Sequence, residues 1–467
     1  MQTSHNGHEA PGPPATQDEL TQELIHDARE TGPRMRRALW ILAAIATLGV
    51  VAALLMMLGG LDDHTRWKYY AVGYFYVFSL VMGIPMAGIG LRFARAQWRR
   101  PTSRAAELFA LAGPVMLVFF IPIMAAHPGL EGRNSLWMDW RLAPWFPDLL
   151  MLTTFVGIGL IFLYVSVLPD LAAIRDHGSG RSRGIAASLA YGWVGTAQQW
   201  AMHKSGLGIL GAMYIAAYAT THMVFATDYA MVLTPGWKDP IFPAFHAVTG
   251  LQMGLGLFIV VQFALRKWGG LARYFELEQF WAYGRLLLAL TLFWFYFFWS
   301  GFILFWYGRL PHEQQVLALL AFGDPAVENL LARPQLWMFV GAIGLSFITA
   351  FLLIMWNPVR RSILGPAVVG VIIVIGNFFD RLRIYVNTWS IEQVGGHELH
   401  HIPTNIGYPG ILEILVFAGM LSGVALMILL ASRVVPFVSL WETREALLLR
   451  VVRPFGVGHA HIVAKPD

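Results

Sequence analysis

The sequence predicts an all-α integral membrane protein with about ten transmembrane helices. Hydrophobic residues make up 57% of the 467 residues and charged residues only 13%, whereas soluble domains carry roughly 25% charged residues. Apolar runs of about 20 residues, the length that crosses the hydrocarbon core of a bilayer, recur along most of the chain. The basic residues cluster between these runs, so the net charge of +5 indicates membrane-flanking loops rather than nucleic-acid binding.

Ten apolar segments are expected to form a membrane domain over residues 34–436. In chain order they are Ala38–Gly60, Tyr69–Ala94, Ala105–Ala126, Phe146–Leu168, Leu207–Leu233, Ile241–Leu265, Trp281–Gly308, Leu336–Trp356, Ile363–Val386 and Tyr408–Ser432. Basic residues precede the first segment and follow the second, fourth, sixth, eighth and tenth. By the positive-inside rule, both termini then face the cytoplasm.

Polar tails are expected at both ends of the chain. Residues 1–33 lack the apolar core of a signal peptide, although a short amphipathic stretch follows over Asp18–Glu30. Residues 437–467 form the second cytoplasmic tail. The chain has no cysteine, which excludes disulfides, thiolate-held iron–sulfur clusters and cysteine zinc sites within it.

Polar residues inside the fifth span point to a functional site, because a polar or charged side chain at membrane depth needs water or a partner. This span contains His222 and Asp228 in its outer half. By the predicted topology, residues of four other spans reach a similar depth near the outer face. The candidate ligand-binding set is His127, Asp148, His222, Asp228, His246 and Trp306.

His222 and Asp228 are the predicted catalytic residues. Six residues of helix separate them by about 9 Å along the axis and roughly 120° around it. We therefore expect no direct contact between them, and expect them to line two parts of one cavity or a proton path. Imidazole beside carboxylate suits proton-coupled redox chemistry, because a quinol releases two protons as it gives up two electrons. The alternative is a packed His222 bonded to a backbone carbonyl. Trp306 also has an alternative explanation in the aromatic belt of membrane proteins.

A second set of ionisable residues is predicted to form a proton path, namely Glu107, Asp170, Arg175, Asp380 and Arg381. Glu107 and Asp170 lie toward the cytoplasmic side, whereas Asp380 and Arg381 lie late in the ninth span. Because adjacent residues point in different directions on a helix, each of the last two is expected to have a partner on another helix. The alternative is an ion-pair network that fixes the loops.

The outer loop contains His397, Glu398 and His401 with the spacing of a zinc-binding helix motif. The segment is short and polar and lies between a glycine pair and a proline. We therefore expect a loop that faces solvent or a partner, and no metal site.

Several motifs, taken together in their order along the ten spans, carry a family resemblance over about Trp67 to Arg444. They are Arg104-Ala105-Ala106-Glu107, Leu168-Pro169-Asp170-Leu171-Ala172, Arg175-Asp176, Gly192-Trp193, His222 through Asp228, Pro235-Gly236-Trp237, Ile241-Phe242-Pro243, Trp306-Tyr307-Gly308, Asp380-Arg381 and Pro403-Thr404. In these the chain resembles the NrfD/polysulfide-reductase family of membrane subunits. It is most similar to the large quinol-binding subunits of alternative complex III.

The resemblance implies two four-helix bundles, over about 69–234 and 240–386, flanked by the first and tenth spans. It implies a quinone (menaquinone or ubiquinone) near the outer face, at His127, Asp148, His222 and Asp228, and no haem or metal in this chain. It also implies an iron–sulfur subunit as electron acceptor, with other membrane subunits, lipids and c-type cytochromes as further partners. Such respiratory or photosynthetic complexes lie in the bacterial cytoplasmic membrane, and some translocate protons.

The sequence departs from the family pattern at three places. His127 stands in an Ala-His-Pro-Gly segment where Gly-Arg-Pro is usual, Lys238 replaces a common histidine, and Pro147 precedes Asp148. These departures leave open a structural or proton-conducting copy without a working quinone site. Two further interpretations are a cytochrome-b-like carrier, with His222 and His246 as haem ligands, and a secondary transporter.

Overall fold

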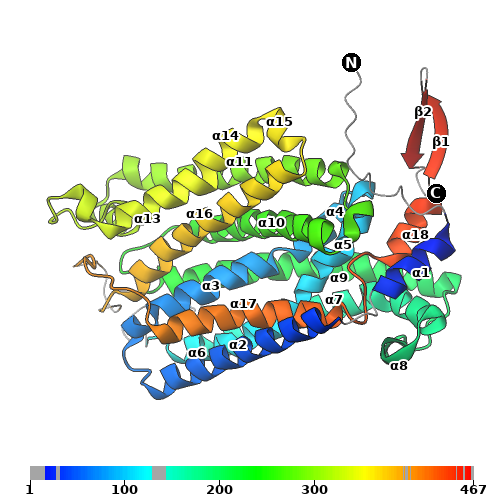
Figure 1. The fold of residues 1–467 in the computed structure, drawn as a ribbon. Coiled ribbons are helices and arrows are strands. Elements are labelled where there is room, and N and C mark those ends of the chain that lie inside the picture. The colour runs from blue at the N-terminus through cyan, green and yellow to red at the C-terminus, as the bar shows by residue number, and fades with distance from the viewer. Residues whose placement is uncertain are drawn as a thin grey trace.

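Long helices run side by side in the computed structural model of the chain (Figure 1). The structure describes residues 16–27, 32–128, 144–392, 394, 398–399, 401–448, 450–455 and 458–463. Within these residues, nine helical segments are long and apolar enough to cross a membrane: Pro33–Leu58, His64–Phe93, Gln97–Ala125, Trp145–His177, Ala197–Met231, Phe242–Trp268, Leu277–Gly308, Pro334–Met355 and Ile411–Ala431. The expectation of an all-α, multi-pass membrane protein is therefore confirmed.

Five of these segments are single helices: α2 (Pro33–Leu58), α7 (Trp145–His177), α10 (Phe242–Trp268), α11 (Leu277–Gly308) and α17 (Ile411–Ala431). Proline stands in the first turn of α2 and α10, where its missing N–H has no helical acceptor. The 33 residues of α7 give it a length of about 50 Å. Since a bilayer core is about 30 Å thick, α7 extends beyond the membrane.

The other four segments are shorter helices joined end to end. They are η1 (His64–Trp67), α3 (Lys68–Met82) and α4 (Pro85–Phe93); η2 (Gln97–Arg99), α5 (Arg100–Glu107), η3 (Leu108–Leu111) and α6 (Ala112–Ala125); α9 (Ala197–Ala226) and η4 (Thr227–Met231); and α13 (Pro334–Ile343), η8 (Gly344–Thr349) and α14 (Ala350–Met355). A capping box between Thr196 and Gln199 begins α9 well before the predicted start at Leu207. Both η4 and η8 are π-helical turns, which often occur at functional sites.

One further long helix, α16 (Leu364–Trp389), is not among the nine apolar segments. Its 26 residues give it a length of about 39 Å, and it packs against α3, α10 and α13. Asp380, Arg381 and Arg383 occupy its second half and are all buried. The polar half of α16 therefore faces other helices rather than lipid.

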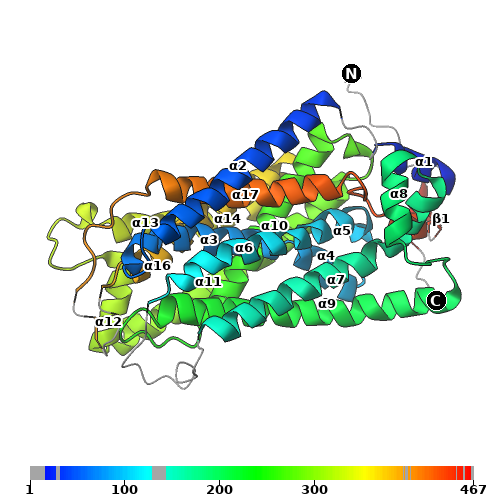
Figure 2. The same ribbon diagram turned by 90° about the horizontal axis from the view of Figure 1, so that it is seen from below.

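The first and last helices of the described chain lie at the same end of the molecule, as both views show (Figures 1 and 2). These are α1 (Gln17–Asp27) and α18 (Leu440–Leu448), which pack together. Arg444 of α18 donates from Nε to the hydroxyl of Thr21 in α1 at 3.0 Å. We call this end, defined by α1 and α18, the terminal end.

Short elements complete the described chain: α8 (Gly180–Leu189), η5 (Leu271–Arg273), α12 (Pro311–Leu317), η6 (Ala318–Phe322), η7 (Leu330–Ala332), α15 (Asn357–Arg360), β1 (Arg450–Phe455) and β2 (Gly458–Val463). The two strands pair as an antiparallel hairpin after α18. This hairpin is the one exception to the helical fold among the described residues, and nothing in the sequence analysis anticipated it.

Helix contacts divide the long segments into groups. One group contains α3, α6, α7 and α9, in which α3 touches α6, α6 touches α7 and α7 touches α9. A second contains α10, α11, α14 and α16, each in contact with the next, and α16 also touches α10. The two groups meet where α3 and α9 contact α10 and α3 contacts α16. Outside both groups, α2 and α17 pair along their length (Figure 2).

Replacing Gly49 with alanine is expected to lower the melting temperature of the purified protein. A Cβ at Gly49 would lie 2.5 Å from the Cα of Gly419, so α2 and α17 would have to separate. Overpacking of this kind costs about 1–3 kcal/mol. The control is Gly157→Ala in α7, where a Cβ meets no atom within 4 Å. Equal melting temperatures for the two variants would contradict the predicted close contact.

Candidate functional site

Three predicted site residues meet where α6 and α9 end and α7 begins. Asp148, in the first turn of α7, and Asp228, in η4, are 0% and 1% exposed. Their carboxyl groups interact with each other and with the hydroxyl of Tyr229. His127, just after α6, donates from Nε2 to the backbone carbonyl of Asp228 at 2.9 Å. We call His127, Asp148, Asp228 and Tyr229 the acid cluster.

The π-helical turn η4 holds two members of the acid cluster in the interior. Both Asp228 and Tyr229 are buried although they are adjacent in sequence. The turn is fixed from a second helix, because the indole Nε1 of Trp389 in α16 donates to the carbonyl of Tyr229 at 3.0 Å. The wider π turn thus lets successive polar residues share one interior site.

The acid cluster brings two buried carboxyl groups together in an apolar interior. Within the described residues, neither carboxylate oxygen of Asp148 nor the hydroxyl of Tyr229 has a hydrogen-bond partner. Aromatic rings flank His127, since the rings of Tyr229 and Trp389 lie 5.0 and 6.2 Å from its ring.

His222 lies apart from the acid cluster, in α9 but closer to the middle of the molecule. Its buried ring is 4.3 Å from the ring of Tyr218 and 5.2 Å from that of His246. Within the described residues, neither ring nitrogen has a hydrogen-bond partner. His222 is therefore packed in the interior, as the alternative interpretation expected. The hydrogen bond to a backbone carbonyl that this interpretation included is not found.

A chain of aromatic rings connects His222 with the acid cluster. The ring of Phe78 is 5.2 Å from that of His222 and 4.9 Å from that of Phe225, which in turn is 5.7 Å from Tyr229. These side chains fill the space between His222 and Asp228. The expectation that both residues line one cavity is therefore wrong: the rise of about 9 Å between them places His222 beyond the aromatic layer.

The two central histidines are not arranged as a pair of haem ligands. Nε2 of His246 is bonded to the hydroxyl of Tyr385 at 2.9 Å. A Cβ built on Gly250 would lie 2.5 Å from Nε2 of His222, so the backbone of α10 closes against that nitrogen. Both nitrogens that would face an iron are thus directed at protein atoms, which disfavours the cytochrome-b-like interpretation.

Asp380 and Arg381 were each predicted to have a partner on another helix, and such partners are found for Arg381 only. Arg381 donates to the hydroxyl of Ser79 in α3 at 3.3 Å and to the carbonyl of His246 in α10 at 3.1 Å. Asp380 instead pairs within its own helix, at 2.7 Å from Nη2 of Arg383. The expectation of a partner on another helix is wrong for Asp380, because Arg383 lies one turn along the same face.

A buried ion-pair network occupies the terminal end. Arg104, which is 0% exposed, lies 3.2 Å from Glu107 and 3.0 Å from Asp170. Arg92 extends the network by pairing with Glu107 at 2.7 Å and with Glu442 of α18 at 3.0 Å. Glu107 and Asp170, two members of the predicted proton path, are therefore joined through arginine. The alternative of an ion-pair network describes these contacts equally well.

Acidification is expected to release α18 from the helices. Burial raises the pKa of Glu442, but the adjacent Arg99 and Arg92 outweigh it and lower the pKa from 4.5 to about 2. A carboxylate with a lowered pKa stabilises the fold above pH 4.5, and this contribution disappears as the pH falls toward 2. Fluorescence of Trp441 in α18 should report the change. Glu442→Gln should remove this acid dependence, and an unchanged acid transition in that variant would contradict the assignment.

Other predicted residues lie away from both the acid cluster and the buried ion-pair network. Trp306 is 51% exposed on α11, so its assignment to the ligand pocket is corrected: that face of α11 points outward. Arg175 pairs with the neighbouring Asp176 at 2.8 Å, near the terminal end but outside the Arg104 network. His397 lies outside the described residues, and no group of three or more metal-ligating side chains is found within them.

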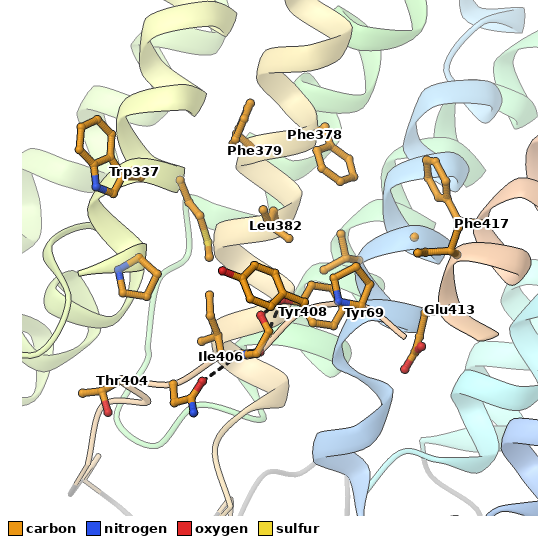
Figure 3. A pocket seen from close by; sticks show the side chains of 18 of the residues that line it. Tyr69, Trp337, Phe378, Phe379, Leu382, Thr404, Ile406, Tyr408, Glu413 and Phe417 are labelled. Atoms are coloured by element: carbon orange, nitrogen blue, oxygen red, sulfur yellow. Dashed lines mark hydrogen bonds between the residues drawn. The ribbon is translucent and has the colours of Figure 1, made fainter. Parts of the chain in front are cut away.

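Of the three cavities described, the largest lies among helix ends opposite α18 (Figure 1) and is shown from close by in Figure 3. Its volume is about 650 Å³, and it opens between α3, α13, α16 and α17. Several aromatic side chains line it, including Tyr69, Trp337, Phe378 and Phe417 (Figure 3). Glu413 is its one lining carboxylate. Neither this cavity nor the two smaller ones described is lined by His127, Asp148, His222 or Asp228.

Comparison with protein-family models and with curated proteins finds no match for this chain. The assignment of the acid cluster therefore rests on its own geometry. Sequence reasoning missed Tyr229 and Glu442. Tyr229 could have been found as the neighbour of an intramembrane aspartate, whereas Glu442 lies outside every apolar segment and gave no signal.

Proposed function

We propose that this chain is the quinol-binding membrane subunit of a multi-subunit respiratory or photosynthetic redox complex. The observation that carries the proposal is the acid cluster, in which two interacting buried carboxyl groups, a tyrosine hydroxyl and an imidazole meet at one end of the helices. Quinol oxidation needs proton acceptors placed against a planar ring. Asp228 and Asp148 are the acceptors in this proposal, and His127 orients the Asp228 turn.

The topology that goes with this function has ten spans. They are the nine apolar segments together with α16, which is the ninth span in chain order. The contact between α1 and α18 supports an even number of crossings, because it brings both ends of the chain to one side. In this proposal, the groups α3–α9 and α10–α16 are the two four-helix bundles expected from the resemblance to the NrfD family, with α2 and α17 as flanking helices. The basic residues near the terminal end favour a cytoplasmic position for it, in the bacterial inner membrane.

Electrons from the quinol must leave through another protein. Within the described residues, no cluster of side chains could hold a metal ion, and the chain lacks the cysteines that ligate iron–sulfur clusters. The partner in this proposal is an iron–sulfur subunit on the face opposite the terminal end, beside the acid cluster. Further membrane subunits and c-type cytochromes complete the complex.

In this proposal, protons enter the chain at the terminal end, through the buried ion-pair network. The network of Arg104, Glu107 and Asp170 contains buried carboxylates and the hydroxyl of Ser166, which donates to Glu107 at 2.6 Å. Asp380 and Arg381 lie farther along α16. These groups make proton translocation an additional role of the chain. A proton-conducting copy without a quinone site is the second candidate. It is favoured by the observation that no residue of the acid cluster lines any of the three described cavities.

The experiment that tests the proposal is reduction of the native complex by a quinol. The complex is purified with this chain as bait, a soluble menaquinol or ubiquinol analogue is added, and iron–sulfur reduction is followed by electron paramagnetic resonance. Rapid reduction that a quinone-site inhibitor blocks supports the proposal. A complex without an iron–sulfur subunit, or one that quinol does not reduce, contradicts it.

A further inference from the structure

A second cavity, of about 600 Å³, lies at the terminal end among three separate segments. The end of α7, the start of α9 and α18 form its walls, and Figure 1 shows these elements gathered at that end. The α7 and α9 segments are membrane-spanning candidates. The cavity is therefore located where spanning helices leave the apolar layer, the depth at which lipid headgroups lie.

Tryptophan side chains form one wall of this cavity. Trp193, Trp200 and Trp441 all line it, and their rings are in contact: the centroid of Trp200 is 5.2 Å from that of Trp193 and 5.8 Å from that of Trp441. Alanine and leucine side chains add further apolar surface. Tryptophan gathers at the headgroup level of bilayers, because its ring is apolar and its N–H is polar.

Cations from three elements face the same space. Arg175 of α7, Lys204 of α9 and Arg444 of α18 all line the cavity. Arg444 donates only to the hydroxyl of Thr21 and has no carboxylate partner within the described part of the chain. This half-buried guanidinium is a candidate anchor for an anion.

The carboxylates of the cavity pair with two of its three cations. Asp176 pairs with Arg175 at 2.8 Å, and Glu445 is shared between Lys204 at 3.5 Å and Arg100 at 3.4 Å. Asp170 is engaged by Arg104 at 3.0 Å. Within the described residues, Arg444 is therefore the lining cation that is left without a carboxylate. The cavity is complementary to a single negative charge with apolar substituents.

We propose that this cavity holds the phosphate headgroup of an anionic glycerophospholipid from the adjacent leaflet. The phosphodiester accepts hydrogen bonds from Arg444 and Lys204, and the glycerol backbone packs on the tryptophan wall. The lipid then ties α18 to α7 and α9, because its ligands come from all three. This inference depends on the membrane location of the chain and not on quinone chemistry.

Native mass spectrometry of the purified full-length protein tests this proposal. The protein is delipidated and titrated with phosphatidylglycerol or phosphatidylcholine. We expect one phosphatidylglycerol to bind at least tenfold more tightly than phosphatidylcholine. Arg444→Gln should remove most of this preference, whereas Lys267→Gln, an equal loss of charge at an exposed position on α10 outside the cavity, should keep it.

Two further measurements keep the result interpretable. Lys204→Gln leaves the contact between Arg444 and Thr21 in place, so a several-fold loss of the lipid preference in this variant supports the site even if Arg444→Gln loosens α18. Equal binding of the two lipids, or equal losses in Lys204→Gln and Lys267→Gln, would overturn the proposal. Displacement of the lipid by millimolar inorganic phosphate would also overturn it, in favour of a site for the free ion.

Discussion

Quinol oxidation should fall at least about 100-fold when Asp228 is replaced by asparagine, since loss of a positioned proton acceptor typically costs 10²–10⁴ in rate. Asparagine keeps the size of the side chain, so the buried turn η4 should still form. Asp148 would remain as a single carboxyl group without its interacting carboxyl partner. The measurement is the rate of quinol oxidation by the purified complex, together with the amount of complex assembled.

Two control variants make this result specific. Asp239→Asn carries the same substitution in the loop before α10, where the carboxylate accepts from the backbone N–H of Ile241 and Phe242, and should retain full activity. Leu382→Trp fills part of the 650 Å³ cavity and should also leave the rate unchanged. Normal turnover in Asp228→Asn with a loss in Leu382→Trp would move the ring-binding site to that cavity.

Replacing Arg104 with glutamine should destabilise the protein more than any other single change at the terminal end. Arg104 is 0% exposed and neutralises Glu107 and Asp170, which are 1% and 0% exposed. Removing one partner of a buried ion pair leaves uncompensated charge and costs about 3–5 kcal/mol. We expect a strongly lowered melting temperature and poor yield of the variant in detergent.

The matched control is Arg66→Gln in the short helix η1, which precedes α3. Arg66 pairs with Asp63 at 3.1 Å, but their side chains are 69% and 49% exposed. Exposed pairs of this kind contribute about 0–1 kcal/mol. A similar loss of stability in both variants would show that the Arg104 network does not act as a buried unit.

The membrane-spanning segments could be predicted from the sequence because bilayer thickness imposes one length on every apolar run. The end of a helix is less predictable where it leaves the membrane. The capping box that begins α9 at Ala197 is polar, so hydropathy placed the start at Leu207. The short π-helical turn η4 has no marked periodicity, and the β1–β2 hairpin lies outside the apolar segments.

The candidate site could be predicted in part. His127, Asp148 and Asp228 were assigned to one depth by topology, and they do meet. Depth alone does not give the side of a helix, and this explains the errors. His222 faces α10 and His246, while Trp306 faces outward. Burial by side-chain packing, here by Phe78 and Phe225, is a tertiary property that a single sequence does not encode locally.

The position of the quinone ring is the most direct test of the central claim, that the acid cluster is the quinol site. It can be measured in an electron cryomicroscopy map of the native complex prepared with excess quinone. We expect ring-shaped density within hydrogen-bond distance of Asp148 or Asp228 and beside the ring of His127. Ring density in the cavity lined by Trp337 and Phe417, with the acid cluster closed by its own side chains, would contradict it.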